Sequence, residues 1–205
     1  PVVETHFDHV RVPKANLLWG LGQGLKLALM TLNTGRLTVP AACVGTAERC
    51  LQISRQWAKE RKQWGSAIGQ HEAIAAKLGE MAATIFAMDA MVWMVSAMAD
   101  RGATDIRLEA AMAKLFCSEA TWRIADETLQ IRGGRGYETA DSLRARGERP
   151  DPVERILRES RINLIIEGTS EIMRLFIARE ALDGHMRRVG PLLSPGGSVA
   201  SKLPA

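Results

Sequence analysis

The chain has 205 residues, of which 46% are hydrophobic and 24% are charged, and its formal net charge is +4 at pH 7. These proportions are those of an ordinary soluble protein with one domain, or one domain and a remnant of another. The basic residues sit beside acidic ones, which argues against nucleic-acid binding. Three cysteines without CxxC spacing and four scattered histidines predict neither a disulfide framework nor a metal site. Because no uninterrupted apolar stretch reaches the ~18 residues that cross a bilayer, we expect no transmembrane segment.

The first predicted element is a β-strand within residues 2–18. Its strand-forming residues are Val2, Val3, Phe7, Val10 and Val12. Pro13 ends this run, and three glycines follow at alternate positions from Gly20 to Gly24. Because the glycines lack the lysine and hydroxyl residue of a P-loop, we interpret them as a flexible turn that leads into a helix.

Residues 25–182 carry a helical apolar period. We predict a first helix, or a broken pair kinked at Pro40, over residues 27–61. One continuous stripe marks the next helix, and its members are Ile74, Leu78, Met81, Ile85, Met88, Val92 and Val95. A further stripe consists of Leu108, Met112, Leu115, Trp122 and Leu129. A last helix begins after Gly168, with Thr169 or Ser170 as its N-cap. The predicted fold is therefore all-α, an up-down four-helix bundle preceded by a short β-strand remnant.

One long loop interrupts the helical region at residues 133–151. It begins with closely spaced glycines and arginines and continues as a polar, charged stretch. Loops of this length inside a compact domain are often functional. After residue 186 the apolar period is lost, so we expect a flexible tail over residues 187–205.

Two segments could hold an anion. Arg61 and Trp64 are three residues apart, which suits a site that binds an anion and covers a flat ring. The alternative, a helix C-terminus with a favourable basic charge, is the more common outcome for such a segment. Gly133 and Gly134 stand between two arginines and could expose backbone amides to a phosphate. A helix C-cap followed by a loop explains the same residues equally well.

Glu167 is the candidate general base. It follows an apolar run and precedes a helix start. Apolar surroundings favour a protonated carboxyl, whereas the positive end of a helix favours the carboxylate, and such opposing influences can tune a base. On these residues alone, a surface glutamate that stabilises the helix N-terminus remains the commoner explanation.

Taken in order, these segments resemble the acyl-CoA dehydrogenase family over residues 2–182. A first motif, arginine-x-x-aromatic-glycine, is matched by Arg61, Trp64 and Gly65. A second is matched by Gln130, Gly133, Gly134, Gly136 and Tyr137. A third is matched by Arg161, Ile162, Glu167, Gly168, Thr169 and Ser170. Residues 33–36 are also similar to the start of the family's first C-terminal helix.

The resemblance implies the chemistry of fatty-acid β-oxidation. Members of the family remove two hydrogens from the α and β carbons of a fatty acyl-CoA. The base maps onto Glu167, and FAD takes the β hydride. Some members carry the base immediately before the arginine of the first helix, but this position is Gly35 here. The resemblance also places Arg36, Ile166 and Gly168 near the substrate.

The resemblance implies an assembly as well. The family is usually a homotetramer built from two dimers, with FAD across a subunit interface. Arg61 and Trp64 would contact the neighbouring subunit's FAD, and Gln130, Gly133 and Gly134 would approach its ADP part. Thr169 would lie near the FAD of its own subunit. An electron-transfer flavoprotein is the usual electron acceptor.

The family also begins with a helical domain and a β domain. We expect residues 1–24 to be the end of the β domain with a linker and residues 25–186 to be the C-terminal helical bundle. The chain would then be a fragment that is inactive by itself. The expected location is the bacterial cytoplasm or, in a eukaryote, the mitochondrial matrix or peroxisome. The alternatives are an acyl-CoA oxidase and a helical oligomerisation module without chemistry of its own. Trp64 departs from the family's commoner phenylalanine, and Glu72 and Glu171 stand where several members have glutamine.

Overall fold

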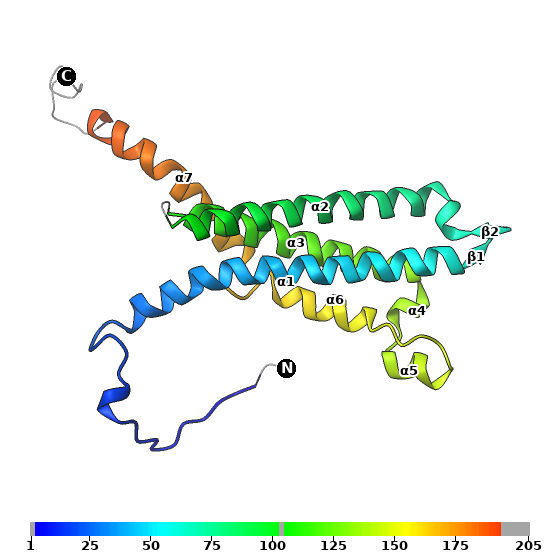
Figure 1. Cartoon of the computed structure of the whole chain (residues 1–205), viewed down its shortest axis with the longest axis horizontal. Helices are drawn as coiled ribbons and strands as arrows, with labels where there is room; N and C mark the ends of the chain where they lie inside the picture. Colours follow the sequence, from blue (N-terminus) through cyan, green and yellow to red (C-terminus); the bar gives the residue numbers. More distant parts are fainter. Residues whose placement is uncertain (1–2, 103–104, 194–205) are drawn as a thin grey trace.

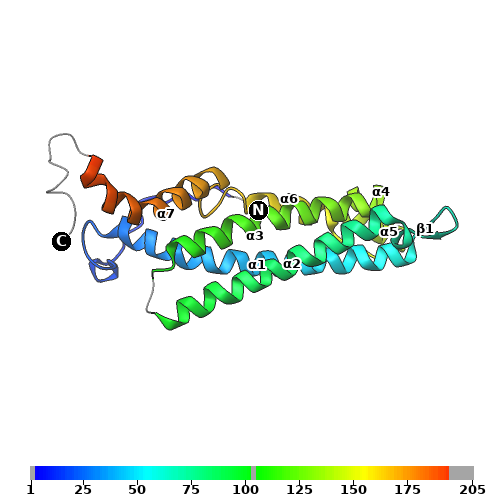
Figure 2. The same cartoon turned by 90° about the horizontal axis from the view of Figure 1, so that it is seen from above.

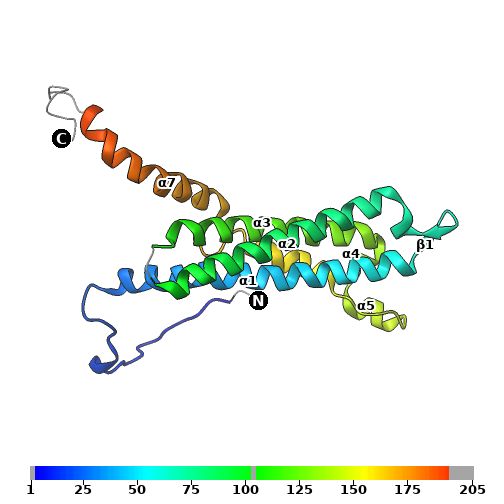
Figure 3. The same ribbon diagram turned by 45° about the horizontal axis from the view of Figure 1, so that its top comes forward.

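The computed structural model describes residues 3–102 and 105–193, and it is an all-α bundle (Figure 1). Helices α1 (Gly24–Glu60), α2 (Glu72–Arg101) and α3 (Arg107–Arg132) run up, down and up beside one another. Helix α6 (Val153–Ile162) and then α7 (Ser170–Leu193) return along α3 (Figure 2). The predicted up-down bundle is confirmed, with its fourth place shared by α6 and the first part of α7. Beyond that part, α7 projects away from the other helices (Figure 3).

Helix α1 continues through Pro40 as one helix of 37 residues. Pro40 lacks the backbone N–H that would bond to the carbonyl of residue 36. Packing of the long helix against α2 and α3 nevertheless keeps this segment helical. Of the two predicted alternatives, the single long helix is therefore confirmed, and the broken pair is wrong.

The apolar stripe of α2 lies where the period predicts it. Met81, Ile85, Met88 and Val95 are buried in the bundle. By length and composition, α2 is the one helix in the described ranges that could cross a membrane. A core helix of a soluble protein meets the same criterion, so this observation is weak evidence for a membrane span.

Helix α3 is the centre of the bundle, because it packs against α1, α2, α6 and α7. Its buried face is made up mainly of small residues, among them Ala110, Ala113, Cys117, Ala120 and Ala125. The larger apolar stripe predicted for this helix is not that face, since Met112 is exposed and the rest of the stripe is only partly buried. Small side chains let several helices pack closely against α3. The spacing of large apolar residues in the sequence could not predict this face.

The predicted N-terminal strand does not form in the described residues 3–18. The chain there is extended and exposed and contains one 3-10 turn, η1 (Lys14–Asn16). A strand requires a partner to which its backbone groups can bond, and none lies beside this segment in the part of the chain that the structure describes. The small sheet lies elsewhere, as the hairpin of β1 (Lys62–Gln63) and β2 (Ser66–Ala67) between α1 and α2, followed by η2 (Ile68–Gln70).

The loop predicted over residues 133–151 is partly helical. It contains α4 (Gly134–Tyr137) and α5 (Ala140–Ala145). Thr139 caps α5 by accepting a hydrogen bond from the Ser142 backbone N–H. At the other terminus, α7 extends to Leu193, and the remainder of the predicted tail lies outside the described residues.

Candidate functional site

Glu167 lies in a tight turn between α6 and α7, which we call the Glu167 turn (residues 163–169). Glu167 has φ +56° and Gly168 has φ +97°, so two successive residues adopt left-handed conformations. Such a conformation is unusual for a residue other than glycine and persists only where neighbouring contacts fix it. The Ser170 N–H bonds to the Leu164 carbonyl across the turn at 3.1 Å. Thr169 caps α7, since its hydroxyl oxygen accepts a hydrogen bond from the Ile172 N–H.

The Glu167 carboxylate reaches the backbone of α1 at Gly35. A Cβ added to Gly35 would lie 2.7 Å from the carboxyl carbon and from Oε2 of Glu167. The missing side chain at Gly35 therefore makes the space that the carboxylate occupies. Oε2 is buried and has no hydrogen-bond partner among the described residues. A carboxylate oxygen that is withdrawn from water and left unpaired is available to accept a proton.

Substituting Gly35 by alanine should separate activity from stability. Alanine favours the helix over glycine by roughly 1 kcal/mol, and the new methyl group would displace only the flexible end of Glu167. We expect Gly35→Ala to unfold at an equal or higher temperature while it lowers any activity that depends on the position of the Glu167 carboxylate. Gly45→Ala is the matched control, because Gly45 is also in α1 and has open space around it. Equal activity of the two variants would contradict the placement of the carboxylate.

The surroundings of the Glu167 turn contain two cations. Arg36 follows Gly35 on α1, and its guanidinium lies over the Phe176 ring at 5.1 Å. Lys114 of α3 is fully buried, and its Nζ donates a hydrogen bond to the Gly168 carbonyl at 2.6 Å. Burial lowers the pKa of Lys114, while the nearby Cys43 and Glu167 act in the opposite direction.

The predicted site residues of the Glu167 turn are thus close to one another. Gly168 cannot carry a side chain without strain, because its φ of +97° is unfavourable for any residue with a Cβ. Ile166 is exposed at the surface beside Glu167. Lys114 was not predicted, although a lysine among the small residues of α3 was a visible signal of a buried cation.

The anion-binding candidates lie at the opposite end of the bundle, around a pocket of about 700 Å³ that we call the Arg132 pocket. Its lining includes Trp57, Arg61, Arg132, Gly133, Gly134 and Arg149. Arg61 and the two glycines are therefore together as predicted. Trp64 and Gln130 are not in the lining: Gln130 is exposed on α3, and Trp64 is 89% exposed at the tip of the hairpin. The Trp64 ring contacts His71 edge-on.

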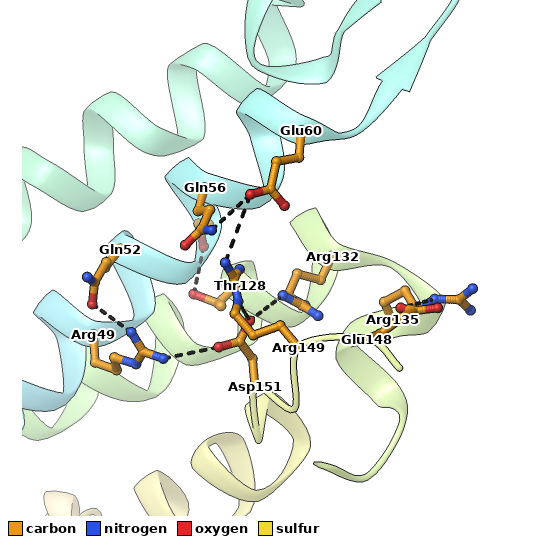
Figure 4. Close-up of polar contacts among 11 residues, drawn as sticks. Arg49, Gln52, Gln56, Glu60, Thr128, Arg132, Arg135, Glu148, Arg149 and Asp151 are labelled. Atoms are coloured by element: carbon orange, nitrogen blue, oxygen red, sulfur yellow. Dashed lines mark hydrogen bonds and ion pairs between the residues drawn. The ribbon is translucent and has the colours of Figure 1, made fainter. Parts of the chain in front are cut away.

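Arg132 and Arg149, which line the Arg132 pocket, belong to an ion cluster around the buried Asp151 (Figure 4). Asp151 is almost completely buried and accepts from Arg132 at 2.8 Å, Arg149 at 2.7 Å and Arg49 at 3.1 Å. The Arg132 guanidinium also lies over the Trp57 ring at 4.9 Å. Burial lowers the pKa of Arg132, and the charge of Asp151 opposes this effect. The cluster ties the loop before α6 to α1 and α3.

The two ends of the bundle are far apart. Gly35 and Arg61 are 26 residues apart on α1, which corresponds to about 40 Å at 1.5 Å per residue. Glu167 and the Arg132 pocket are thus not parts of one site within a single chain. Elsewhere, the ranges 3–102 and 105–193 contain no group of three or more His, Cys, Asp or Glu residues that could hold a metal ion.

Comparisons with known proteins agree with this geometry. A family profile described as "Acyl-CoA dehydrogenase, C-terminal domain" matches residues 22–182. The protein named "Probable acyl-CoA dehydrogenase FadE10" of Mycobacterium tuberculosis is 56% identical over 201 residues, which are 98% of this chain and 31% of that protein. The human mitochondrial "Very long-chain specific acyl-CoA dehydrogenase" is 42% identical over 96% of this chain and 28% of its own length.

A solved structure gives the same result. The acyl-CoA dehydrogenase from Bacillus anthracis, complexed with FAD, superposes with a TM-score of 0.73 at 30% identity, and the match covers 91% of this chain and 35% of that one. The chain spans less than a third of the length of the curated relatives described above. The profile match over most of the chain, together with the bundle and the Glu167 turn, shows that this chain belongs to the acyl-CoA dehydrogenase family and carries its C-terminal domain.

Proposed function

We propose that this chain acts as the C-terminal domain of a flavin-dependent enzyme that dehydrogenates fatty acyl-CoA thioesters between their α and β carbons. The observation that carries the proposal is the Glu167 carboxylate, which a left-handed turn directs against Gly35 with one oxygen buried and unpaired in the described structure. In this function Glu167 takes the α proton. FAD, when bound, accepts the hydride that leaves the β carbon.

The residues around the Glu167 turn would receive the substrate. Ile166 and Gly168 flank the base, and Arg36 lies on the adjacent turn of α1. A neighbouring cation favours the negative charge that develops on the thioester as its α proton leaves. The similarity to a very long-chain specific relative and to FadE10 favours fatty acyl-CoA as the substrate class.

The Arg132 pocket fits a phosphate-bearing part of FAD. Gly133 has φ +58° and has open space beside it, so its backbone can be approached closely. Arg61 supplies a cation that suits a pyrophosphate. We assign Gln130 and Trp64 to the rim of this binding surface, and Thr169 to the FAD near Glu167. Because the pocket is about 40 Å from the Glu167 turn, we infer that it serves the FAD of a neighbouring subunit in a homodimer or homotetramer.

The remaining assignments follow from the same proposal. Residues 1–24 would join the bundle at residues 25–186 to a preceding flavin-binding β domain. An electron-transfer flavoprotein would take the electrons. The cytoplasm is the expected location in a bacterium, as the mycobacterial relative suggests, whereas a eukaryotic protein would be in the mitochondrial matrix or peroxisome.

The absorption spectrum of a longer protein that carries this chain after the two missing domains tests the function. We expect a flavin band that bleaches when palmitoyl-CoA is added without oxygen, and no retained flavin in the 205-residue chain alone. A longer protein that binds no flavin, or whose flavin stays oxidised with every acyl-CoA tried, would contradict the proposal. Rapid hydrogen peroxide formation in air would identify an oxidase instead.

A further inference from the structure

Lys114 is an unusual residue for the centre of a helical bundle. Its side chain is fully buried on the small-residue face of α3, between Ala110 and Cys117 in the helical period. Lysine is almost never fully buried unless its ammonium has a partner, because withdrawal of the charge from water is unfavourable. An apolar residue would fill the same position without this cost, so the ammonium itself requires an explanation.

The partner of this ammonium is the backbone directly after Glu167. Nζ donates to the Gly168 carbonyl oxygen at 2.6 Å. This hydrogen bond joins α3 to the Glu167 turn, 54 residues further along the chain. It is charge-assisted and made in a buried place, which are the conditions in which a hydrogen bond is strongest.

The bond acts on the Gly168–Thr169 peptide unit, one residue beyond Glu167. Glu167 and Gly168 are both in left-handed conformations, which the sequence does not favour at Glu167. The Met173 side chain packs against Gly168 from one side, and Lys114 fixes its carbonyl. With both contacts in place, the backbone of Gly168 has little freedom to rotate, which holds the turn and keeps the carboxylate against Gly35.

We propose that Lys114 is a positioning residue for the base: its ammonium holds the Gly168 carbonyl and so keeps the Glu167 carboxylate aimed at the α carbon of the substrate. The proposal rests on the proposed function, because it gives a role to Lys114 only where Glu167 takes a proton. Lys114 acts through the Gly168 carbonyl and does not itself exchange a proton with the substrate.

Lys114→Met in the longer flavin-containing protein tests this role, because methionine has a similar length without the charge or the donors. Misplacement of a reacting group by about 1 Å can cost about 10²-fold in rate. We therefore expect kcat per bound flavin to fall by about that factor while KM for palmitoyl-CoA changes little. The isotope effect with α-deuterated palmitoyl-CoA should rise, since proton abstraction becomes the slow step. Lys114→Gln, whose amide can still donate to the carbonyl, should recover part of the rate.

A matched control separates positioning from stability. Thr128→Val removes another buried hydrogen-bonding group of α3, about 21 Å further along the helix. A purely structural role for Lys114 predicts that both variants lose folded protein and flavin while kcat per bound flavin and the isotope effect stay at the wild-type values. That result for Lys114→Met would overturn the proposal. If this variant does not fold, the same comparison is made with Lys114→Leu, which also lacks the charge and the donors, and an unchanged rate and isotope effect in that variant would overturn the proposal.

The Glu167→Gln variant distinguishes this proposal from the function on which it rests. A wild-type rate in Glu167→Gln would remove the proposed base and, with it, the role of Lys114. An inactive Glu167→Gln beside a fully active Lys114→Met would leave the function intact and refute the positioning role alone.

Discussion

Substituting Glu167 by glutamine is expected to abolish flavin reduction by acyl-CoA while flavin binding is retained. The amide has nearly the same size as the carboxylate but cannot take a proton, and a positioned general base contributes about 10²–10⁴-fold to a rate. Glutamine can occupy the same space beside Gly35, so the turn and the bundle should keep their structure. Stopped-flow measurement of flavin bleaching by palmitoyl-CoA gives the rate directly.

Glu171→Gln is the control for that experiment. Glu171 lies four residues further on, exposed in the first turn of α7, and it loses the same charge. We expect it to bleach at a rate close to that of the wild type. A Glu167→Gln protein that bleached as fast as Glu171→Gln would show that another group takes the α proton.

The second large effect is expected from Asp151→Asn. Asp151 faces three arginines, and one of them, Arg132, is as deeply buried as Asp151 itself. Removal of the carboxylate charge leaves the Arg132 guanidinium without its counterion in the interior, and loss of one partner of a buried ion pair typically costs about 3–5 kcal/mol. Urea unfolding should report this loss in the free energy of unfolding. The variant should also lose flavin, because Arg132 and Arg149 line the pocket that we assign to FAD.

Two further variants define the cause of that loss. Asp141→Asn removes an exposed ion pair with Arg144 on α5, and its unfolding should be indistinguishable from that of the wild type. The double variant Arg132→Met with Asp151→Asn removes the buried charge together with its partner and should recover part of the lost stability. A single Asp151→Asn variant as stable as Asp141→Asn would mean that the cluster does not hold the loop.

The sequence predicted those parts of the fold that repeat along one helix. The period of α2 identified Met81, Met88 and Val95 as core residues, and all three are buried. The prediction missed the buried face of α3 because most residues of this face are small. A search for periodic large apolar residues does not detect a face on which small side chains let neighbouring helices pack closely. Pro40 left two alternatives open for α1, and the single helix formed because local propensity yields to packing in a helix of this length.

The candidate site was predicted in part for a similar reason. Glu167, Gly168 and Thr169 are contiguous in the sequence, so their motif could be read directly. The partner of Lys114 lies 54 residues away, and Asp151 pairs not only with the nearby Arg149 but also with Arg49, 102 residues away. No pattern within a short stretch of sequence predicts such a long-range contact. For Lys114 the available signal was a single charge among small residues, and this signal does not identify the residue that the charge contacts.

The length of the bundle has a genetic consequence. If the pocket at one end serves a flavin that meets the base of the neighbouring chain, each working site draws on two copies of the protein. Assemblies made only of copies that lack Glu167 would be inactive, and so would assemblies made only of copies with a disrupted Arg132 pocket. In a dimer that contains one copy of each kind, one site would have both defects and the other site would have neither. Two harmful alleles that affect opposite ends of the bundle could therefore complement each other, whereas two alleles at the same end could not.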